Sequence, residues 1–488
     1  MTSPKILLGG SGEKQIFLQA AMANRHGLIA GATGTGKTIS LQVLAEGFSR
    51  LGVPLLVTDI KGDLSGLSQP AKPHPKIDQR IQAIGIDDYQ ASACPTVFWD
   101  VFETQGLPLR VSVSDMGPLL LSSLLELNET QTGILYALFD LADDEGLLVL
   151  DLKDLNAMLG WMADNAAELK SDYGLVSGSS IAAIRRKLLI LEEQGADQFF
   201  GEPALKLEDI MITDFSGQGL INILDATRLS SQSPRIYSAF LLWFLSELYE
   251  NLPEVGDADR PRFVCLFDEA HLLFDQSSSA LVDKIEQIVR LIRSKGVGIY
   301  FITQSPLDIP EDVLGQLGLR IQHALRAFTP KDKKAVDTVA QTFRPNPELD
   351  IRQEIGALGI GEALVSTLQL DGTPSVVEKT LMRPPQSQIG PVDTPTRQLL
   401  VSRSPLYSRY ATDLDRESAF ELLKQRANEK AALAEQQRVA EQASQPARRP
   451  GRPRQSFADA MIKSTLRSLG GTLGRRIARG ILGSLLGK

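Results

Sequence analysis

A glycine-rich stretch near the start of the chain has the spacing of a phosphate-binding loop, with Lys and Thr directly after its last glycine. Glycines let the backbone curl so that several N–H groups point at phosphate oxygens, and the next helix presents its positive N-terminal end to the same anion. In this pattern the lysine reaches the β- and γ-phosphates, and the threonine hydroxyl ligates Mg²⁺. The residues predicted to bind ATP and Mg²⁺ are Gly31, Ala32, Thr33, Gly34, Thr35, Gly36, Lys37 and Thr38.

Two adjacent acids, Asp268 and Glu269, follow the apolar run 263–267, which is typical of a buried strand. A phosphate-binding loop of this kind needs a later strand that ends in an acid, so we predict that Asp268 holds the Mg²⁺ shell. Glu269 is then placed to polarise the water that attacks the γ-phosphate. The paired acids favour an ATPase over a nucleotide kinase, which need not activate water. The alternative is a pair of acids that only caps the strand.

Two further polar residues are candidates for the same chemistry. Gln304 follows the apolar run 298–303, where an amide can donate to phosphate and orient water as a sensor. The alternative is an ordinary polar residue between strand and loop. Arg293, with Arg290, lies at the end of a predicted helix over 280–294, and the planar donors of arginine suit a finger that acts on the ATP of a neighbouring subunit. The alternative is a cation placed favourably at a helix C-terminus, worth ~0.3–1 kcal/mol.

The segment Asp59–Asp63 follows a second apolar strand, so it is predicted to support the nucleotide site from the C-terminal edge of the sheet, without a specific role. The letters Asp-Glu-Ala-His at 268–271 match a helicase box. Helicases of that type have two tandem lobes, and the sequence gives no sign of a second one. His271 is therefore interpreted as a packing or positioning residue.

The elements around these motifs indicate the fold class. An apolar run over 27–30, a helical pattern over 37–51 and a second apolar run over 53–59 predict a β-α-β unit, and hence a parallel sheet covered by helices. We predict an α/β fold with a mostly parallel sheet, a helical insertion and a flexible basic C-terminal tail. The predicted parts are 1–117 (first half of the core), 118–210 (helical insertion), 211–383 (second half of the core), 384–456 (charged linker) and 457–488 (basic amphipathic helix).

The net charge of −8 on 488 residues hides an asymmetry. From Ser444 to Lys488 the chain carries ten basic residues and one acid, which gives +9 and leaves −17 for the remainder. Such a tail indicates an anionic partner, with nucleic acid, an acidic protein surface and lipid headgroups as candidates, and a merely solvated tail as the alternative. The Arg/Pro/Gly stretch 448–454 resembles part of a minor-groove-binding motif. The amphipathic stretch 473–486 suits either a membrane surface, as a peripheral contact, or docking on protein.

The compartment is predicted from what the sequence lacks. No apolar run approaches the ~20 residues of a membrane span, so no transmembrane segment is expected. The stretch Met1–Lys5 lacks the apolar character of a signal peptide. The chain has two cysteines, and Cys265 lies in a very apolar strand, which favours a core residue in a reducing compartment over a disulfide. We therefore predict a cytoplasmic protein.

Taken together, the motifs resemble the HerA/FtsK superfamily of P-loop ATPases, in particular the HerA-like group of YjgR-type proteins. The likeness covers nearly the whole chain, and its motifs occur in the family's order at 26–38, 59–63, 266–271, 293–298, 302–305 and 473–486. HerA proteins of the DNA-repair type carry an N-terminal β-barrel, which is expected to be absent here because only about 30 residues precede the loop.

The resemblance implies a RecA-like ATPase that assembles as a ring, often a hexamer, and in many members moves DNA. It implies Walker A roles for Lys37 and Thr38, a Walker B pair in Asp268 and Glu269, a sensor role for Gln304 and a trans-acting finger in Arg293. We therefore expect a ring-forming ATPase coupled to double-stranded DNA translocation or remodelling, with DNA and a further protein as candidate partners. The alternative is an ATP-driven scaffold or assembly protein that does not move DNA.

Overall fold

One mixed sheet of twelve strands organises the part of the chain that the computed structural model describes, which is residues 4–444 without 13, 170, 172, 173, 175, 257, 276–278, 327 and 328. The strands are β1 (Lys5–Ser11), β2 (Lys14–Gln19), β3 (Gly27–Ala30), β4 (Leu55–Asp59), β5 (Thr96–Asp100), β6 (Leu107–Pro108), β7 (Ile221–Asp225), β8 (Phe263–Phe267), β9 (Val297–Thr303), β10 (Leu319–Gln322), β11 (Glu362–Ser366) and β12 (Glu378–Met382). Their order is β2-β1-β12-β11-β10-β3-β9-β8-β4-β7-β5-β6. Every neighbouring pair from β10 to β6 is parallel, and the pairs from β2 to β10 are antiparallel.

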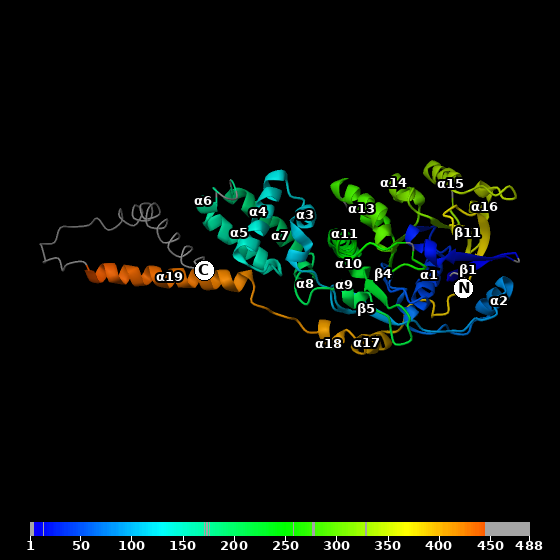
Figure 1. The fold of residues 1–488 in the computed structure, drawn as a ribbon, viewed down its shortest axis with the longest axis horizontal. Coiled ribbons are helices and arrows are strands. Elements are labelled where there is room, and N and C mark those ends of the chain that lie inside the picture. Colours follow the sequence, from blue (N-terminus) through cyan, green and yellow to red (C-terminus); the bar gives the residue numbers. More distant parts are fainter. Residues whose placement is uncertain are drawn as a thin grey trace. The chain divides into compact units, whose positions relative to one another are not determined.

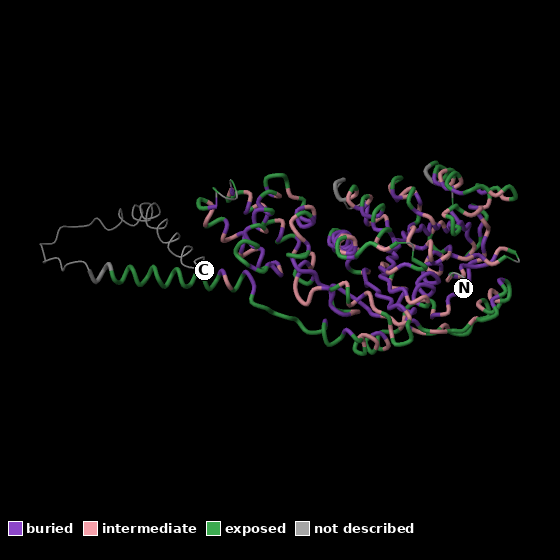
Figure 2. Tube along the Cα trace, viewed as in Figure 1, coloured by how far each residue is buried: buried purple, intermediate pink, exposed green. Residues whose placement is uncertain are grey.

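The central strands are covered on both faces, because successive residues point into two different apolar cores. In β8, Val264 and Leu266 belong to the core that includes helix α1 (Lys37–Arg50). Cys265 belongs to the core on the other face, which includes α11 (Pro234–Asn251) and α13 (Ser279–Leu291). Figure 2 shows these strands as buried. Continuous apolar runs are typical of parallel strands buried in this way, and the predicted α/β fold with a mostly parallel sheet is confirmed.

The residues from Met1 to Gln425 form one compact unit. The short helices that connect its strands bring polar residues to the edges of the sheet. They are η1 (Ala20–Arg25), η2 (Ser65–Ser68), α2 (Pro75–Ile84), α10 (Thr227–Gln232), α12 (His271–Asp275), η3 (Ile292–Lys295), η4 (Pro306–Asp308), α14 (Glu311–Leu314), α15 (Pro330–Thr342) and α16 (Ile351–Ala357).

Between β6 and β7 the described chain is mainly helical, and α3, α4, α5 and α7 gather in one group, cyan to green in Figure 1. Each of these four helices begins after a residue whose side chain accepts a backbone N–H of the first turn, and such caps favour helix initiation there. The indole of Trp243 in α11 donates to the carbonyl of Asp115 in α3 at 3.2 Å, which ties this group to the core. The helices are α3 (Val113–Leu124), α4 (Glu129–Glu145), α5 (Leu152–Asp164), α6 (Ala166–Leu169), α7 (Gly178–Glu192), α8 (Ala196–Phe199) and α9 (Leu207–Ile210).

The chain after β12 forms α17 (Thr394–Ser402), α18 (Tyr407–Tyr410) and α19 (Ala419–Ser444). Up to Gln425 it packs within the first unit, because Arg397 Nη2 lies 2.8 Å from Asp225 Oδ2 and the Ser418 hydroxyl donates to Asp154 Oδ1 at 2.5 Å. The second unit begins at Arg426, and its described part is the remainder of α19, in which residues 426–440 are exposed. The predicted tail features at 448–454 and 457–488 lie outside the described residues.

Candidate functional site

The phosphate-binding loop joins the end of β3 to the start of α1, and its turns depend on glycine. Gly31, Gly34 and Gly36 have φ angles of 153°, 77° and 119°, a region that favours glycine over residues with a side chain. A Cβ on Gly31 would also lie 2.6 Å from the Cβ of His323, closer than real Cβ contacts allow. Backbone geometry therefore favours glycine at 31 and 36, the two positions where the phosphate-binding pattern requires it, and also at 34.

Lys37, the first residue of α1, turns its ammonium back onto the loop. Its Nζ donates to the carbonyl oxygens of Gly31 at 2.6 Å and Ala32 at 3.2 Å, and the residue is only 4% exposed. Burial lowers the pKa of Lys37, and the charge of Lys61 lowers it further. Thr38 follows in the first turn of the same helix. The structure thus places a buried cation, held by two loop carbonyls, and Thr38 at the start of the helix that follows the loop.

His323 contacts the end of β3 and helix α1, on either side of the loop, and the sequence does not predict this role. It follows β10, the parallel neighbour of β3, and its backbone N–H donates to the carbonyl of Ala30 at 2.7 Å. Its ring nitrogens lie 2.8 Å from the Ser40 hydroxyl and 2.9 Å from the Glu362 carbonyl. Burial lowers the pKa of His323 to about 4, so the ring is neutral at pH 7. A neutral imidazole can accept at one nitrogen and donate at the other, which suits a positioning residue.

The predicted acids lie where β8 ends, at the same edge of the sheet as the loop. The Asp268 backbone N–H donates to the Thr58 hydroxyl at 3.0 Å, and burial raises the pKa of the Asp268 carboxyl to about 6. Glu269 has a φ of 45°, an uncommon left-handed conformation for a residue with a side chain. Such conformations cost about 1–3 kcal/mol and persist where the surrounding structure imposes them.

Three side chains converge on the Glu269 carboxylate. Gln304 Nε2 lies 3.3 Å from Oε2, and His271 Nδ1 lies 3.4 Å from the same oxygen. Lys61 Nζ lies 2.7 Å from Oε1 and 3.7 Å from Asp268 Oδ2. Burial acts to raise the pKa of Glu269, but the hydrogen bond and charge of Lys61 outweigh it, so the pKa lies below its usual range. The predicted acid and the predicted sensor are therefore brought together.

Asp59 explains how Lys61 reaches the acids. Its carboxylate accepts the backbone N–H groups of Gly62 at 2.7 Å, Asp63 at 3.1 Å and Leu64 at 3.0 Å, which folds the segment after β4 into a fixed turn. Burial is the main cause that raises the pKa of Asp59 to about 7. The turn also aims Asp63 inward, and its Oδ1 is a buried atom for which the described residues supply no hydrogen-bond partner. The segment predicted only to support the site thus contributes two charged groups to it.

These residues fit a nucleoside triphosphate with Mg²⁺. Burial raises the pKa of Asp63, while the charge of Lys61 and a hydrogen bond with the Thr38 hydroxyl act against it. The Asp63 carboxylate therefore contacts the hydroxyl predicted to bind metal and keeps one buried oxygen without a partner among the described residues. Carboxylate and hydroxyl oxygens are ligands that Mg²⁺ prefers, and Mg²⁺ usually takes its remaining ligands from water and phosphate. Among the described residues no group of three or more His, Cys, Asp or Glu is arranged to hold a metal by itself. The donor set therefore suits a metal that arrives with phosphate.

Arg293 is not part of this constellation. It is an exposed residue of η3, which precedes β9, and the carbonyl of Arg293 accepts from Asn24 Nδ2 at 3.4 Å. The sheet is parallel here, so η3 lies at the edge where β3, β8 and β9 begin, whereas the loop lies where they end. The seven residues of β9 span roughly 23 Å, at ~3.3 Å per residue. Arg293 therefore lies beyond reach of the loop of its own chain.

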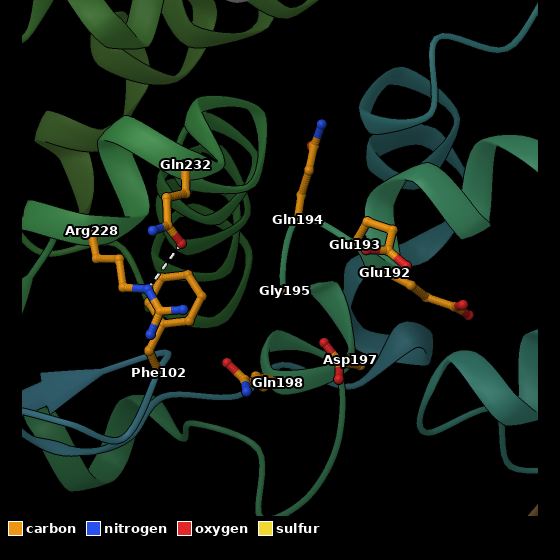
Figure 3. A pocket seen from close by; sticks show the side chains of 9 residues that line it. All are labelled: Phe102, Glu192, Glu193, Gln194, Gly195, Asp197, Gln198, Arg228 and Gln232. Carbon is orange, nitrogen blue, oxygen red and sulfur yellow. Dashed lines mark hydrogen bonds between the residues drawn. The ribbon is translucent and has the colours of Figure 1, made fainter.

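A cavity of about 390 Å³ lies apart from the loop, between the end of α7, the short helix α8 and the core (Figure 3). On the core side the Arg228 guanidinium lies over the Phe102 ring, 4.1 Å from its centroid, and its Nε donates to Gln232 Oε1 at 2.9 Å. None of the predicted site residues lines it, so the predicted chemistry is not located there. The lining residues are Phe102, Glu192, Glu193, Gln194, Gly195, Asp197, Gln198, Arg228 and Gln232.

None of the helices in the described part of the chain combines the length and apolar character that crossing a membrane requires.

Known proteins resemble the chain in sequence and in fold. A family model described as Helicase HerA-like C-terminal matches residues 5–488. The chain is 23% identical over 381 residues to the DNA double-strand break repair helicase HerA of Sulfolobus acidocaldarius, covering 74% of this chain but only 65% of that protein. The bacterial conjugative coupling protein TrwBdeltaN70 has a TM-score of 0.52 at 13% identity, over 79% of this chain and 90% of that one. The plasmid coupling protein TrwB in complex with the non-hydrolysable ATP analogue ADPNP has a TM-score of 0.50 at 15% identity. The match covers 75% of this chain and 87% of the TrwB chain.

Proposed function

The chain belongs to the helicase HerA-like C-terminal family, and we propose that it is a ring-forming ATPase that couples ATP hydrolysis to movement or remodelling of double-stranded DNA. The observation that carries the proposal is the meeting of Lys37, Glu269 and Gln304 at one edge of the parallel sheet. A helix-covered sheet with a strained acid beside a phosphate-binding loop is suited to hydrolysing a phosphate anhydride.

We assign the chemistry as follows. ATP with Mg²⁺ supplies the γ-phosphoryl group that is transferred to water. The loop N–H groups and Lys37 bind the phosphates, and Thr38 with Asp268 holds the metal. Glu269, a carboxylate at neutral pH, orients the attacking water and accepts its proton. Gln304 holds the Glu269 side chain in place and also senses the γ-phosphate.

Ring formation is supported by the position of Arg293 on the sheet edge opposite the loop. An arginine there can act on ATP only if another copy of the chain presents its loop to it, and a closed ring of six copies gives every site one such neighbour. DNA is favoured as the substrate because the Sulfolobus acidocaldarius relative is a DNA double-strand break repair helicase. The basic stretch from Ser444 to Lys488 adds a segment suited to anionic partners.

The proposal is tested by measuring ATP turnover with and without double-stranded DNA. We expect DNA to raise the turnover, and we expect the affinity for DNA to fall with salt, at a slope of about −0.9 per phosphate neutralised in a log–log plot. ATP turnover that DNA leaves unchanged, together with no DNA binding at low salt, would favour an ATP-driven scaffold that does not move DNA. Absence of ATP turnover under all conditions would overturn the enzyme assignment.

Replacing Glu269 by Gln separates binding from chemistry. Gln keeps the size of the side chain but cannot accept the proton of water, so we expect ATP binding to persist and turnover to fall by ~10²–10⁴. The measurement combines a titration with an ATP analogue and a phosphate-release assay. Glu378→Gln is the matched control, because Glu378 also pairs with a lysine, Lys14 at 2.6 Å, but on the antiparallel side of the sheet. Equal turnover in both variants would remove Glu269 from the reaction.

We place the protein in the cytoplasm. Its two cysteines, Cys94 and Cys265, are both buried and free, which suits a reducing compartment. Burial raises the pKa of the Cys94 thiol to about 12, so Cys94 stays protonated and unreactive. A second protein and a peripheral membrane contact through the basic stretch remain candidate partners beside DNA.

A further inference from the structure

Lys61 is one of two charged residues of the site, with Asp63, that the predicted chemistry leaves without a task. Its ammonium lies 2.7 Å from Glu269 Oε1 and 3.7 Å from Asp268 Oδ2, while its side chain is 36% exposed. Burial alone would lower the pKa of Lys61, but Asp268, Glu269 and Asp63 outweigh it and the pKa lies above its usual range. Lys61 is therefore a cation held by carboxylates at a position that remains open to solvent.

The pairing has a consequence for Glu269. A carboxylate that accepts a hydrogen bond from an ammonium is a weaker base, because the charged form is already stabilised. Glu269 Oε1 is occupied by Lys61, and Oε2 faces Gln304 Nε2 at 3.3 Å and His271 Nδ1 at 3.4 Å. Both oxygens of the proposed base are thus engaged by protein groups in the structure.

A terminal phosphate would compete for the same ammonium. Lys61 binds an acid that follows β8, at the same edge of the sheet where the loop follows β3. After burial, the charge of Lys61 is the next cause that lowers the pKa of Lys37. A γ-phosphate bound by Lys37 therefore lies within the field of Lys61, and a phosphate carries more negative charge than a carboxylate. A nucleoside diphosphate does not bring this third phosphate.

We propose that Lys61 is a triphosphate-sensing residue that holds Glu269 until a γ-phosphate draws its ammonium away. Lys61 then acts as a specificity-determining and positioning residue: it favours triphosphate over diphosphate, and it frees Glu269 for water only when the group to be transferred is bound. The inference rests on the proposed ATPase function, and it deepens it by assigning the discrimination between the two nucleotides to one side chain.

The test compares the affinities of Lys61→Met and wild-type protein for an ATP analogue that is not hydrolysed and for ADP, both with Mg²⁺. Met keeps most of the length of Lys without its charge. We expect Lys61→Met to lose roughly tenfold in affinity for the triphosphate, about what a hydrogen bond between charged groups contributes, and to keep its affinity for ADP. Lys61→Arg retains a cation, so it should keep much of the wild-type preference for the triphosphate analogue over ADP. Lys14→Met is the matched control, since Lys14 pairs with Glu378 on the antiparallel side of the sheet, and it should change neither affinity.

A double-mutant cycle adds a readout that a structural role of Lys61 would not move. In Glu269→Gln the ammonium has lost its main partner, so the triphosphate should bind several-fold more tightly than to wild type, and this gain should vanish in Lys61→Met/Glu269→Gln. Unfolding temperatures of all variants verify that they are folded, and Lys61→Gln replaces Lys61→Met if the latter does not fold.

The outcomes separate this inference from the proposed function. Nucleotide binding by wild type that is equal for triphosphate and diphosphate, or a preference that Lys61→Met leaves unchanged, would overturn the role of Lys61 while leaving the ATPase intact. Lack of any nucleotide binding by wild type would overturn the proposed function itself, and the role of Lys61 with it.

Discussion

Replacing Lys37 by Ala is expected to reduce ATP turnover to the background of the assay and to abolish measurable nucleotide binding. The Lys37 ammonium is held by two loop carbonyls, Gly31 at 2.6 Å and Ala32 at 3.2 Å, and its pKa is lowered by burial. A buried ammonium with such partners gains most from an incoming anion, because phosphate oxygens are stronger acceptors than carbonyl oxygens. Alanine removes that cation from the centre of the loop.

The fold should survive the Lys37→Ala change. The variant removes the ammonium from the Gly31 carbonyl, while the Ala32 carbonyl keeps the Thr35 hydroxyl as a donor at 2.7 Å. The cost is ~1–3 kcal/mol, which is smaller than the ~5–15 kcal/mol by which native proteins are stable. Thermal unfolding measures that cost, and Lys37→Met, which keeps the apolar stem, separates loss of charge from loss of packing. Lys14→Ala is the control for an exposed lysine. Wild-type turnover in folded Lys37→Ala protein would refute the assignment of the loop.

The sequence predicts the elements around the loop closely. The strand expected at 27–30 is β3 with the same bounds, and the helix expected over 37–51 is α1, which ends at Arg50. Both depend on local signals, a short apolar run and glycines with positive φ, and local signals are what a single sequence carries. The predicted resemblance is confirmed by the family model over residues 5–488, and the RecA-like α/β fold by the coupling-protein structures.

Several elements carried weaker signals and are absent from the sequence prediction. The strand β5 (Thr96–Asp100) is only five residues long and follows a proline, so its pattern does not differ from that of a loop with apolar residues. The strands β11 and β12 lie on the antiparallel side of the sheet and mix polar with apolar residues. The helices α17 and α18 pack through a few scattered apolar residues, such as Leu406 and Tyr410, and through polar contacts, such as that of Arg397 with Asp225, so the sequence shows no regular apolar period there.

The site residues that the sequence did not resolve depend on sheet order. Lys61 meets Glu269 because β4 pairs with β8 in a register that sets Thr58 beside Phe267. His323 reaches the loop because β10 is the parallel neighbour of β3. Neither pairing follows from spacing along the chain. The one usable signal is a run of polar residues at the end of an apolar strand, which the Asp59–Asp63 segment shows. His323 follows the mixed run Leu319–Gln322 and gives no such signal.

Arg293→Ala is the change that tests the ring. We expect the variant to bind ATP but to hydrolyse it ~10³–10⁵ more slowly, the range of arginine fingers in GTPases, because each loop would lack the cation of a neighbour. Arg290→Ala is the matched control: Arg290 is also exposed, one turn earlier at the end of α13. If Arg290 only complements the helix dipole, its loss should cost ~0.3–1 kcal/mol of stability and leave turnover unchanged.

Mixing two inactive variants determines whether Arg293 acts across an interface. An Arg293→Ala subunit retains its own Glu269, and a Glu269→Gln subunit retains its own Arg293. Because Arg293 and the loop lie at opposite edges of the sheet, each interface of a mixed ring joins the finger of one subunit to the loop of the next. Interfaces that pair an intact Glu269 with an intact Arg293 should therefore regain turnover that neither variant shows alone.

The mixing result has a clear quantitative form. We assume that subunits exchange at random and that each site acts independently. In an equal mixture, about a quarter of the interfaces then join an intact Glu269 to an intact Arg293. Because fingers act in trans, turnover should approach roughly a quarter of the wild-type value. Turnover should rise and then fall as the ratio of the two variants is varied, with its maximum at equal amounts. Mixed rings of verified composition that stay as inactive as their parents would show that hydrolysis requires a fully intact ring or that Arg293 serves its own subunit. Normal turnover of Arg293→Ala alone would return Arg293 to the role of a charge at a helix end.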